Sequence, residues 1–469
     1  MFLDGIIPAP GWLNSGDTGW QLTAATLVGL QSVPGLAILY AGLMKRKWAL
    51  NSALMVLYAF AMTLLVWTLW SYNMSFGKPI NIGPGFLGIP WPVNFADTEL
   101  GQANIPLLSN NGLLPPLGFP NSAMVYFQFV FAAITVIILG GALLGRMNFK
   151  AWMLFVPLWM TLVYPVGAFM IWGGGWLAQL GAVDYSGGYV IHVAAGVSGV
   201  VAAAVVGPRL LKDRQQNNPS NLLMAIAGGG LLWLGWNGFN GGDPYFANAD
   251  AAAAVLNTNL ATATALLAWM LLDVFMTGKS NVAGMINGMI AGLVAITPAA
   301  GFVNGFAAIA IGAVGAVIPW VTMQYLPRVK AIAKIDDTLG VMHTHFFPGA
   351  IGGLMTGLLA DPNMIVYPGS GSTPAVSVTG LFYGNPKQFL VQALALGVVI
   401  VYNVIATFVV INIVRLLVPL RMPAKHLEVG DEMVHGDVSL DLGTLREGIE
   451  PPSVPVTHEP STEPVEVGS

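Results

Sequence analysis

Apolar residues occur along the chain in long runs, separated by short segments rich in glycine, proline, asparagine and charge. Each run has room for the roughly 20 residues that an α-helix needs to cross a bilayer. The pattern predicts eleven such helices, at about 20–43, 50–74, 122–145, 151–172, 187–207, 221–241, 252–277, 281–299, 302–324, 340–360 and 388–415. We therefore expect an all-α polytopic membrane protein.

The composition supports this class. Hydrophobic residues make up 55% of the chain and charged residues only 9%, whereas soluble domains carry about 25% charged residues. The absence of cysteine excludes disulfides and thiol chemistry. The net charge of −4 is a poor guide to partners, because 10 of the 22 acidic residues lie beyond residue 420. It gives no reason to expect nucleic-acid binding.

Basic residues concentrate in alternate connections between the predicted spans. If the N-terminus lies outside, 16 of the 18 lysines and arginines fall on the inner side, and only Lys78 and Lys387 fall outside. An excess of positive charge marks cytoplasmic loops. The sequence thus predicts an N-out/C-in protein of the cell (inner or plasma) membrane, with the lipid bilayer as a partner. Two long outer loops, 75–121 and 366–386, are expected to shape a vestibule.

The chain divides into three expected regions: a membrane domain (1–416), a cytoplasmic regulatory region (417–450) and a disordered tail (451–469). The tail holds five prolines and three glutamates among its 19 residues, a composition typical of disorder. The N-terminus lacks a basic region ahead of its apolar residues, so no cleavable signal peptide is expected.

One arrangement occurs twice: Asp184 precedes His192 by eight residues, and Asp337 precedes His345 by eight. Each pair opens the fifth span of a five-span half, and an odd number of spans inserts the second half upside down. Eight helical residues rise about 12 Å, which brings each histidine near the centre of a roughly 30 Å core. We expect a 5+5 inverted repeat (spans 1–5 and 6–10) around a central pore, where the two imidazoles could meet. Histidine is costly in a bilayer and usually functional there.

The same residues also allow simpler roles. A carboxylate at a helix N-terminus caps free N–H groups, so Asp337 is interpreted as a cap. For Asp184, capping and attraction of a cation both stay open. His343 and His345 would point about 200° apart on a regular helix, which argues against a shared metal. With no nucleophile–base pair or cofactor loop either, we expect no enzyme, metal or cofactor.

Four motifs resemble signatures of the ammonium transporter (Amt/Mep/Rh) family, particularly its bacterial-type Amt members. They are FQFVFAAITV (127–136), IWGGGWLAQLGAVDYSGGYVIHVAAGVSG (171–199), LGWNGFNGGD (234–243) and IDDTLGVMHTH (335–345). The resemblance covers essentially the whole membrane region. It implies homotrimers of eleven-helix subunits, each with its own pore, that take up ammonium and deliver ammonia with or without a separately relayed proton.

The resemblance assigns roles to matching positions: twin pore histidines (His192, His345), an outer phenylalanine gate (Phe131, Phe239), an outer recruitment site (Trp172, Asp184, Asp243) and a pore-lining tryptophan (Trp236).

Three positions depart from the family pattern. Asp243 often corresponds to serine, and its carboxylate either strengthens cation capture or pairs locally. HTHFFPGAIGG (343–353) replaces the common GVHGVGG, which leaves the shape of the inner pore open. Gly145, just before Arg146, stands where many relatives have glutamate.

The resemblance leaves two other functions open: a neutral ammonia or gas channel of the Rh type, and an ammonium sensor that signals through its tail. Trp172 and Asp243 favour capture of the cation over the first. The segment GDEMVHGD (430–437) resembles the tail that docks PII-class signalling proteins in bacterial relatives. Transport with tail regulation is therefore expected, with a PII-class protein as a possible cytoplasmic partner.

Overall fold

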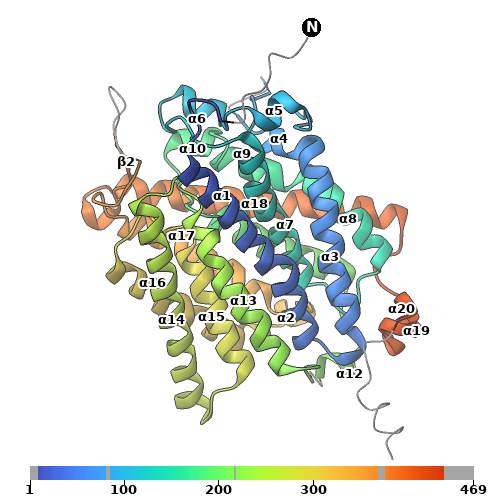
Figure 1. Cartoon of the computed structure of the whole chain (residues 1–469). Helices are drawn as coiled ribbons and strands as arrows, with labels where there is room; N and C mark the ends of the chain where they lie inside the picture. The colour runs from blue at the N-terminus through green and yellow to red at the C-terminus, as the bar shows by residue number, and fades with distance from the viewer. Residues whose placement is uncertain (1–8, 81–84, 216–217, 368–374, 438–469) are drawn as a thin grey trace, which may run out of the picture.

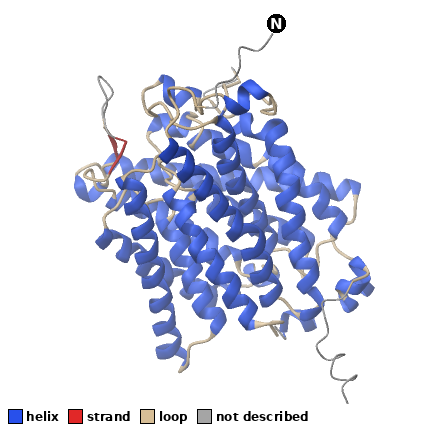
Figure 2. Ribbon diagram, viewed as in Figure 1, coloured by secondary structure: helices blue, strands red, loops and turns tan. Residues whose placement is uncertain are grey.

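The computed structural model describes residues 9–80, 85–215, 218–367 and 375–437. These residues form a bundle of helices with one short two-stranded ribbon, β1 and β2 (Figure 2). Nine helical segments in this part of the chain are long and apolar enough to cross a membrane: Ser15–Leu43, Arg46–Phe76, Asn121–Gly141, Phe149–Leu180, Gly188–Val206, Leu222–Gly241, Ala249–Thr277, Gly305–Arg328 and Pro386–Leu417. The predicted class, a helical multi-pass membrane protein, is confirmed.

The elements follow one another in the order shown in Figure 1. The first half contains α1 (Ser15–Leu30), η1 (Gln31–Gly35), α2 (Leu36–Leu43), η2 (Arg46–Trp48), α3 (Ala49–Val66), η3 (Trp67–Ser71), α4 (Tyr72–Phe76), α5 (Ala96–Leu100), α6 (Pro106–Asn110), α7 (Asn121–Gly141), α8 (Phe149–Leu162), α9 (Tyr164–Ile171), α10 (Trp176–Leu180), η4 (Gly188–Val193), α11 (Ala194–Val206) and α12 (Leu211–Gln215). The second half contains α13 (Leu222–Gly241), α14 (Ala249–Thr277), α15 (Val282–Ile296), α16 (Gly305–Tyr325), η5 (Leu326–Arg328), η6 (Ile332–Lys334), η7 (Met342–Phe346), α17 (Phe347–Leu359), β1 (Ile365–Tyr367), β2 (Val376–Ser377), η8 (Leu381–Tyr383), α18 (Pro386–Leu417), α19 (Ala424–Val429) and α20 (Asp431–His435).

Each predicted span overlaps a helical segment, but two of these segments are not among the nine. The span predicted at 281–299 corresponds to α15, which has 15 residues. The span predicted at 340–360 corresponds to η7 and α17, where His343, His345 and Pro348 lower the hydropathy. The number of eleven crossings and the N-out/C-in orientation stay predictions.

Asparagine begins many of these helices. In six of them the asparagine side chain before the first helical residue accepts a backbone N–H of the first turn: Asn14, Asn148, Asn221, Asn248, Asn281 and Asn304. Such a cap satisfies donors that have no partner within the helix. At these six helices, the asparagine that interrupts the apolar run therefore fixes where the next helix starts.

The bundle has a buried centre and an apolar exterior. Nearly all of α7 is buried, whereas α14 and α18 expose large apolar side chains, among them Phe275, Leu256, Leu390 and Phe408. In Figure 1 α18 runs across the other helices rather than along them. An apolar exterior over a fully hydrogen-bonded helical backbone suits a hydrocarbon environment.

Candidate functional site

Two histidines far apart in the chain meet in the middle of the bundle. The Nδ1 atoms of His192 and His345 lie 3.2 Å apart, across a separation of 153 residues. Both side chains are buried, and the rings are nearly parallel, with centroids 5.3 Å apart. In neutral imidazoles one Nδ1 donates and the other accepts, so one Nε2 is left as an acceptor and the other as a donor. Nε2 of His192 has no hydrogen-bond partner among the described residues.

Each histidine lies in a π-helix that opens its span. His192 belongs to η4 and His345 to η7. The expectation of regular α-helix is wrong at these two turns. A π-turn widens the helix and shifts the register of the side chains that follow, and such turns are frequent at functional sites.

An aspartate caps the start of each π-helix. The Asp184 carboxylate accepts four backbone N–H groups, those of Gly187, Gly188, Tyr189 and Val190, at 2.6–3.0 Å. The Asp337 carboxylate accepts two, from Val341 and Met342, at 3.0 and 2.8 Å. Both aspartates therefore act on the backbone of the helix that bears a histidine.

Glycines let the two histidine helices touch. Gly196 and Gly349 each follow their histidine by four residues. A Cβ at Gly196 would lie 2.5 Å from Cβ of Phe346, and a Cβ at Gly349 would lie 2.7 Å from the Gly188 carbonyl oxygen. Small residues permit such close helix crossings in membranes.

The two helices enter from opposite ends of α7. Asp184 lines a cavity together with Leu114, which precedes α7. Thr338, next to Asp337, donates to the Leu144 carbonyl oxygen just after α7, at 3.0 Å. This antiparallel entry agrees with the predicted inverted repeat.

Aromatic rings continue the line of histidines towards the cavity. Phe131 and Phe239 are fully buried, with ring centroids 4.4 Å apart. Phe239 lies 6.0 Å from the His192 ring, and Trp172 lies 6.1 Å from Phe131, both measured between centroids. The structure thus brings the predicted gate between the predicted outer tryptophan and the histidine pair.

Trp236, to which the resemblance assigns a pore-lining role, lies beside His192. The two rings are stacked with centroids 5.4 Å apart, and the indole Nε1 donates to Thr297 Oγ1 at 2.9 Å. Thr297 fixes the orientation of the tryptophan. No motif around Thr297 in the sequence indicated this role.

The cavity beyond the phenylalanines has a volume of about 430 Å³. Trp172, Asp184, Asp243, Tyr245 and Tyr367 are among the residues that line it. Nε1 of Trp172 donates to the backbone carbonyl oxygen of Asp184 at 2.7 Å. Because the Asp184 carboxylate is engaged by its four N–H partners, Asp243 is the better placed of the two carboxylates to act on the cavity.

Asp243 pairs locally as well as lining the cavity. The Ser186 hydroxyl donates to the Asp243 carboxylate and also lies 2.7 Å from the Phe239 carbonyl oxygen. Burial raises the pKa of Asp243 well above its usual range; the Ser186 hydrogen bond opposes this rise, and the charge of Asp184 adds to it. Sequence reasoning missed Ser186, although it lies two residues after Asp184.

A narrow cavity of about 30 Å³ lies on the other side of the histidine pair. His345, Trp236, Tyr40, Leu339 and Thr344 are among the residues that line it.

The residues that depart from the family pattern near His345 pack between helices. Phe346 contacts Gly196, and Pro348 lies in the first turn of α17. Nδ1 of His343 lies 3.0 Å from Thr322 Oγ1 on α16, so this histidine faces a neighbouring helix.

Known ammonium transporters match nearly the whole chain. The model of the Ammonium Transporter Family matches residues 19–439. Ammonium transporter 2 of Arabidopsis thaliana is 50% identical over 431 residues, which cover 91% of this chain and 88% of that protein. Ammonium transporter 3 member 1 of Oryza sativa subsp. japonica is 50% identical over 445 residues, with 91% and 88% covered.

Solved structures share the fold. The crystal structure of Saccharomyces cerevisiae Mep2 has a TM-score of 0.74 and 30% identity, covering 88% of this chain and 91% of that one. A structure titled Sensor Amt Protein has a TM-score of 0.76 at 24% identity, covering 90% and 98%; at that identity it speaks for the fold alone. The chain belongs to the ammonium transporter family, whose members are transporters or channels rather than enzymes.

Proposed function

We propose that the chain captures ammonium at the Trp172–Asp243 cavity, removes a proton below the phenylalanine gate and conducts ammonia past His192 and His345 into the cytoplasm. The observation that carries this proposal is the continuous line from the cavity through Phe131 and Phe239 to two histidines whose Nδ1 atoms are 3.2 Å apart.

Deprotonation gives the pore its selectivity. Moving an unpaired cation to the centre of a bilayer costs from roughly 3 to above 10 kcal/mol. Removing the proton of an amine whose pKa lies about 3 units above neutral costs about 4 kcal/mol. Ammonium can lower its barrier by this step, whereas potassium cannot. The fully buried Phe131 and Phe239 supply the dry segment that enforces the choice.

The histidine pair suits a small neutral amine. Ammonia both donates and accepts hydrogen bonds, and the pair leaves one Nε2 acceptor and one Nε2–H donor. The unpartnered Nε2 of His192 is such a group. The two linked rings also provide a route along which a separately relayed proton could pass.

Capture depends on the outer cavity. The face of Trp172 attracts any cation, and the Asp243 carboxylate, when ionised, adds a negative charge to the same cavity. Both features favour an ammonium transporter over a neutral gas channel.

The proposal extends to the assembly. We place the N-terminus outside and the C-terminus in the cytoplasm of a cell membrane, with eleven crossings within residues 1–416 and three copies per assembly. Residues 417–450 form a cytoplasmic regulatory region, whose partner would be a PII-class protein. The predicted disordered tail, 451–469, lies outside the described residues.

Capture and conduction can be separated by kinetics. Initial transport rates are measured in proteoliposomes against ammonium concentration for Trp172→Leu and His345→Ala. Trp172→Leu should raise KM by roughly two- to fivefold, because an accessible cation–π contact contributes about 0.5–1 kcal/mol. His345→Ala should lower Vmax instead. Trp91→Leu, which removes an exposed tryptophan, is the control. An unchanged KM in Trp172→Leu together with an unchanged Vmax in His345→Ala would refute the proposal.

A further inference from the structure

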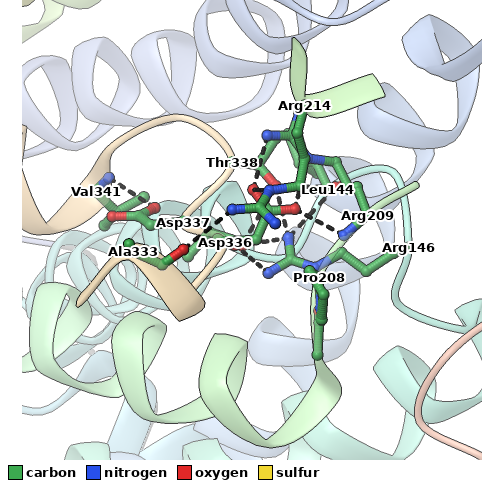
Figure 3. A network of polar contacts seen from close by, with 12 residues as sticks. Leu144, Arg146, Pro208, Arg209, Arg214, Ala333, Asp336, Asp337, Thr338 and Val341 are labelled. Carbon is green, nitrogen blue, oxygen red and sulfur yellow. Dashed lines mark hydrogen bonds and ion pairs between the residues drawn. The ribbon is translucent and has the colours of Figure 1, made fainter. Parts of the chain in front are cut away.

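A buried arginine lies at the end of α7 nearest Asp337. Arg146 has no exposed surface. Its Nη1 donates to the Ala142 carbonyl oxygen and to Thr338 Oγ1, both at 2.5 Å. Its Nη2 donates to the Asp336 carbonyl oxygen, and its Nε to that of Gly207 at 3.0 Å. Figure 3 shows Arg146 close to Asp336 and Thr338.

These acceptors belong to three separate segments: the end of α7, the residue after α11 and the loop before η7. Burial lowers the pKa of Arg146 to about 10, while the charge of Asp336 opposes this shift. The group is therefore charged at neutral pH. A buried charge is costly unless its donors are satisfied, so this arrangement requires the three segments to keep their positions.

The preceding residue supports the same geometry. Gly145 has a φ of +75°, a conformation that other residues rarely adopt. It turns the chain after α7, so that the Arg146 side chain can reach back to the Ala142 carbonyl oxygen. The glutamate that many relatives are expected to carry here would be strained in this backbone.

Arg146 holds the residues on both sides of Asp337. It binds the backbone of Asp336 and the side chain of Thr338, and Asp337 lies between them. The Asp337 carboxylate in turn caps η7 through Val341 and Met342. The guanidinium is thus linked to the π-helix that bears His345 in two steps: its hydrogen bonds hold the backbone around Asp337, and the Asp337 carboxylate caps the helix.

We infer that Arg146 is a positioning residue: it fixes the cap of the His345 helix and thereby the contact between the twin histidines. This inference rests on the proposed role of the histidine pair. Arg146 touches neither histidine, so it acts through Asp337 and the backbone of η7.

Arg209 provides a matched control. It binds the same loop before η7, because its guanidinium forms an ion pair of 2.8 Å with the Asp336 carboxylate. The backbone N–H of Arg209 also donates to this carboxylate, at 2.7 Å. Arg209→Lys keeps the charge and this backbone bond. Arg146→Lys keeps the charge but loses the planar fork that serves four acceptors at once.

The test measures KM and Vmax for ammonium per reconstituted molecule, in Arg146→Lys, Arg209→Lys, His345→Ala and the double variant Arg146→Lys/His345→Ala. We expect Arg146→Lys to lower Vmax by about tenfold or more, because small misplacements of a reacting group are costly. KM should stay unchanged, since the capture site lies at the opposite end of α7. Arg209→Lys should transport nearly as well as the wild type. The double variant should be no slower than His345→Ala alone, because the two changes act on one unit.

The outcomes separate this inference from the proposed function. If His345→Ala lowers Vmax and Arg146→Lys does not, the inference alone fails. Equal losses in Arg146→Lys and Arg209→Lys would also overturn it, since they indicate general loosening of the loop. If His345→Ala has no effect, the proposed function and the inference both fail. Should Arg146→Lys fail to accumulate, Thr338→Val removes one acceptor and leaves the arginine in place; an unchanged Vmax there overturns the inference.

Discussion

The two carboxylates that line the cavity and the two central imidazoles show how neighbouring groups determine what a single residue can do. Asp184 and Asp243 line the same cavity, yet one carboxylate is engaged by four backbone N–H groups and the other by a single hydroxyl. His192 and His345 each spend one ring nitrogen on the other. Asp243 is thus the less engaged of the two carboxylates, and Nε2 of His192 has no hydrogen-bond partner among the described residues.

The raised pKa of Asp243 predicts pH-dependent capture. The carboxyl is neutral below its raised pKa and ionised above it, so attraction of ammonium should strengthen as the pH rises through that value. We expect KM of the wild type to fall with rising pH and to be higher and flat in Asp243→Asn. The difference should be severalfold, since a charge pair that contributes about 1 kcal/mol changes affinity by roughly fivefold.

The measurement is the initial rate against ammonium concentration at several outer pH values, with Asp97→Asn as the control. Asp97 is an exposed carboxylate of α5, in the expected outer loop 75–121. A parallel fall of KM in Asp243→Asn would show that another group controls the pH dependence.

Among the elements, the two helices that bear the histidines, η4–α11 and η7–α17, cross closely because each has a glycine at the crossing. Each begins with an aspartate cap, contains a π-turn with a histidine and presents a glycine one turn later. The caps fix where the helices start, and the glycines fix how closely they approach. The separation of the histidines follows from both.

Gly196→Ala tests this crossing. The added Cβ would lie 2.5 Å from Cβ of Phe346, and overpacking of this kind costs about 1–3 kcal/mol. We expect a lower thermal unfolding temperature in detergent and a lower Vmax. Gly230→Ala on α13 meets nothing within 4 Å and should be neutral or stabilising by up to about 1 kcal/mol. Equal behaviour of the two variants would contradict the tight crossing.

The helices were predictable because every span needs about 20 consecutive, mostly apolar residues to cross a bilayer. Runs of this length are easily found in the sequence. The two aspartate–histidine pairs were found for a similar reason: an equal spacing in two halves survives in the sequence. The Ser186–Asp243 and Arg146–Asp336 contacts join residues 57 and 190 positions apart. Such contacts depend on how the spans cross, and no local spacing records them. The π-turns were missed because their residues also suit a regular helix.

At the scale of the whole molecule, the C-terminal segment packs back onto the bundle. The Asp431 carboxylate accepts the backbone N–H groups of Leu50 and Asn51, at 2.8 and 3.0 Å, in the first turn of α3. Nε2 of His435 lies 2.9 Å from Asn51 Oδ1. Figure 1 shows α19 and α20 beside that end of α3. The segment thus supplies a cap that α3 does not provide itself.

Asp431→Ala should release this segment. Loss of a capping carboxylate costs about 1 kcal/mol, or roughly fivefold in the open population. Hydrogen–deuterium exchange should therefore rise in residues 424–437 and at the start of α3, while α7 keeps its protection. Glu432→Ala, next to it and exposed, is the control. Unchanged exchange in Asp431→Ala would show that other contacts hold the segment.

In the proposed function, selectivity comes from deprotonation above a histidine pair. The most direct test applies ammonium and then potassium to proteoliposomes on a solid-supported membrane, with internal pH followed in parallel, for the wild type and His345→Ala. We expect an ammonium signal in current or internal pH, no potassium current, and loss of the ammonium signal in His345→Ala. An internal pH signal without current would mean that ammonia passes and the proton stays outside. A potassium current comparable to that of ammonium, or a wild-type ammonium signal in His345→Ala, would refute selection by deprotonation at the histidine pair.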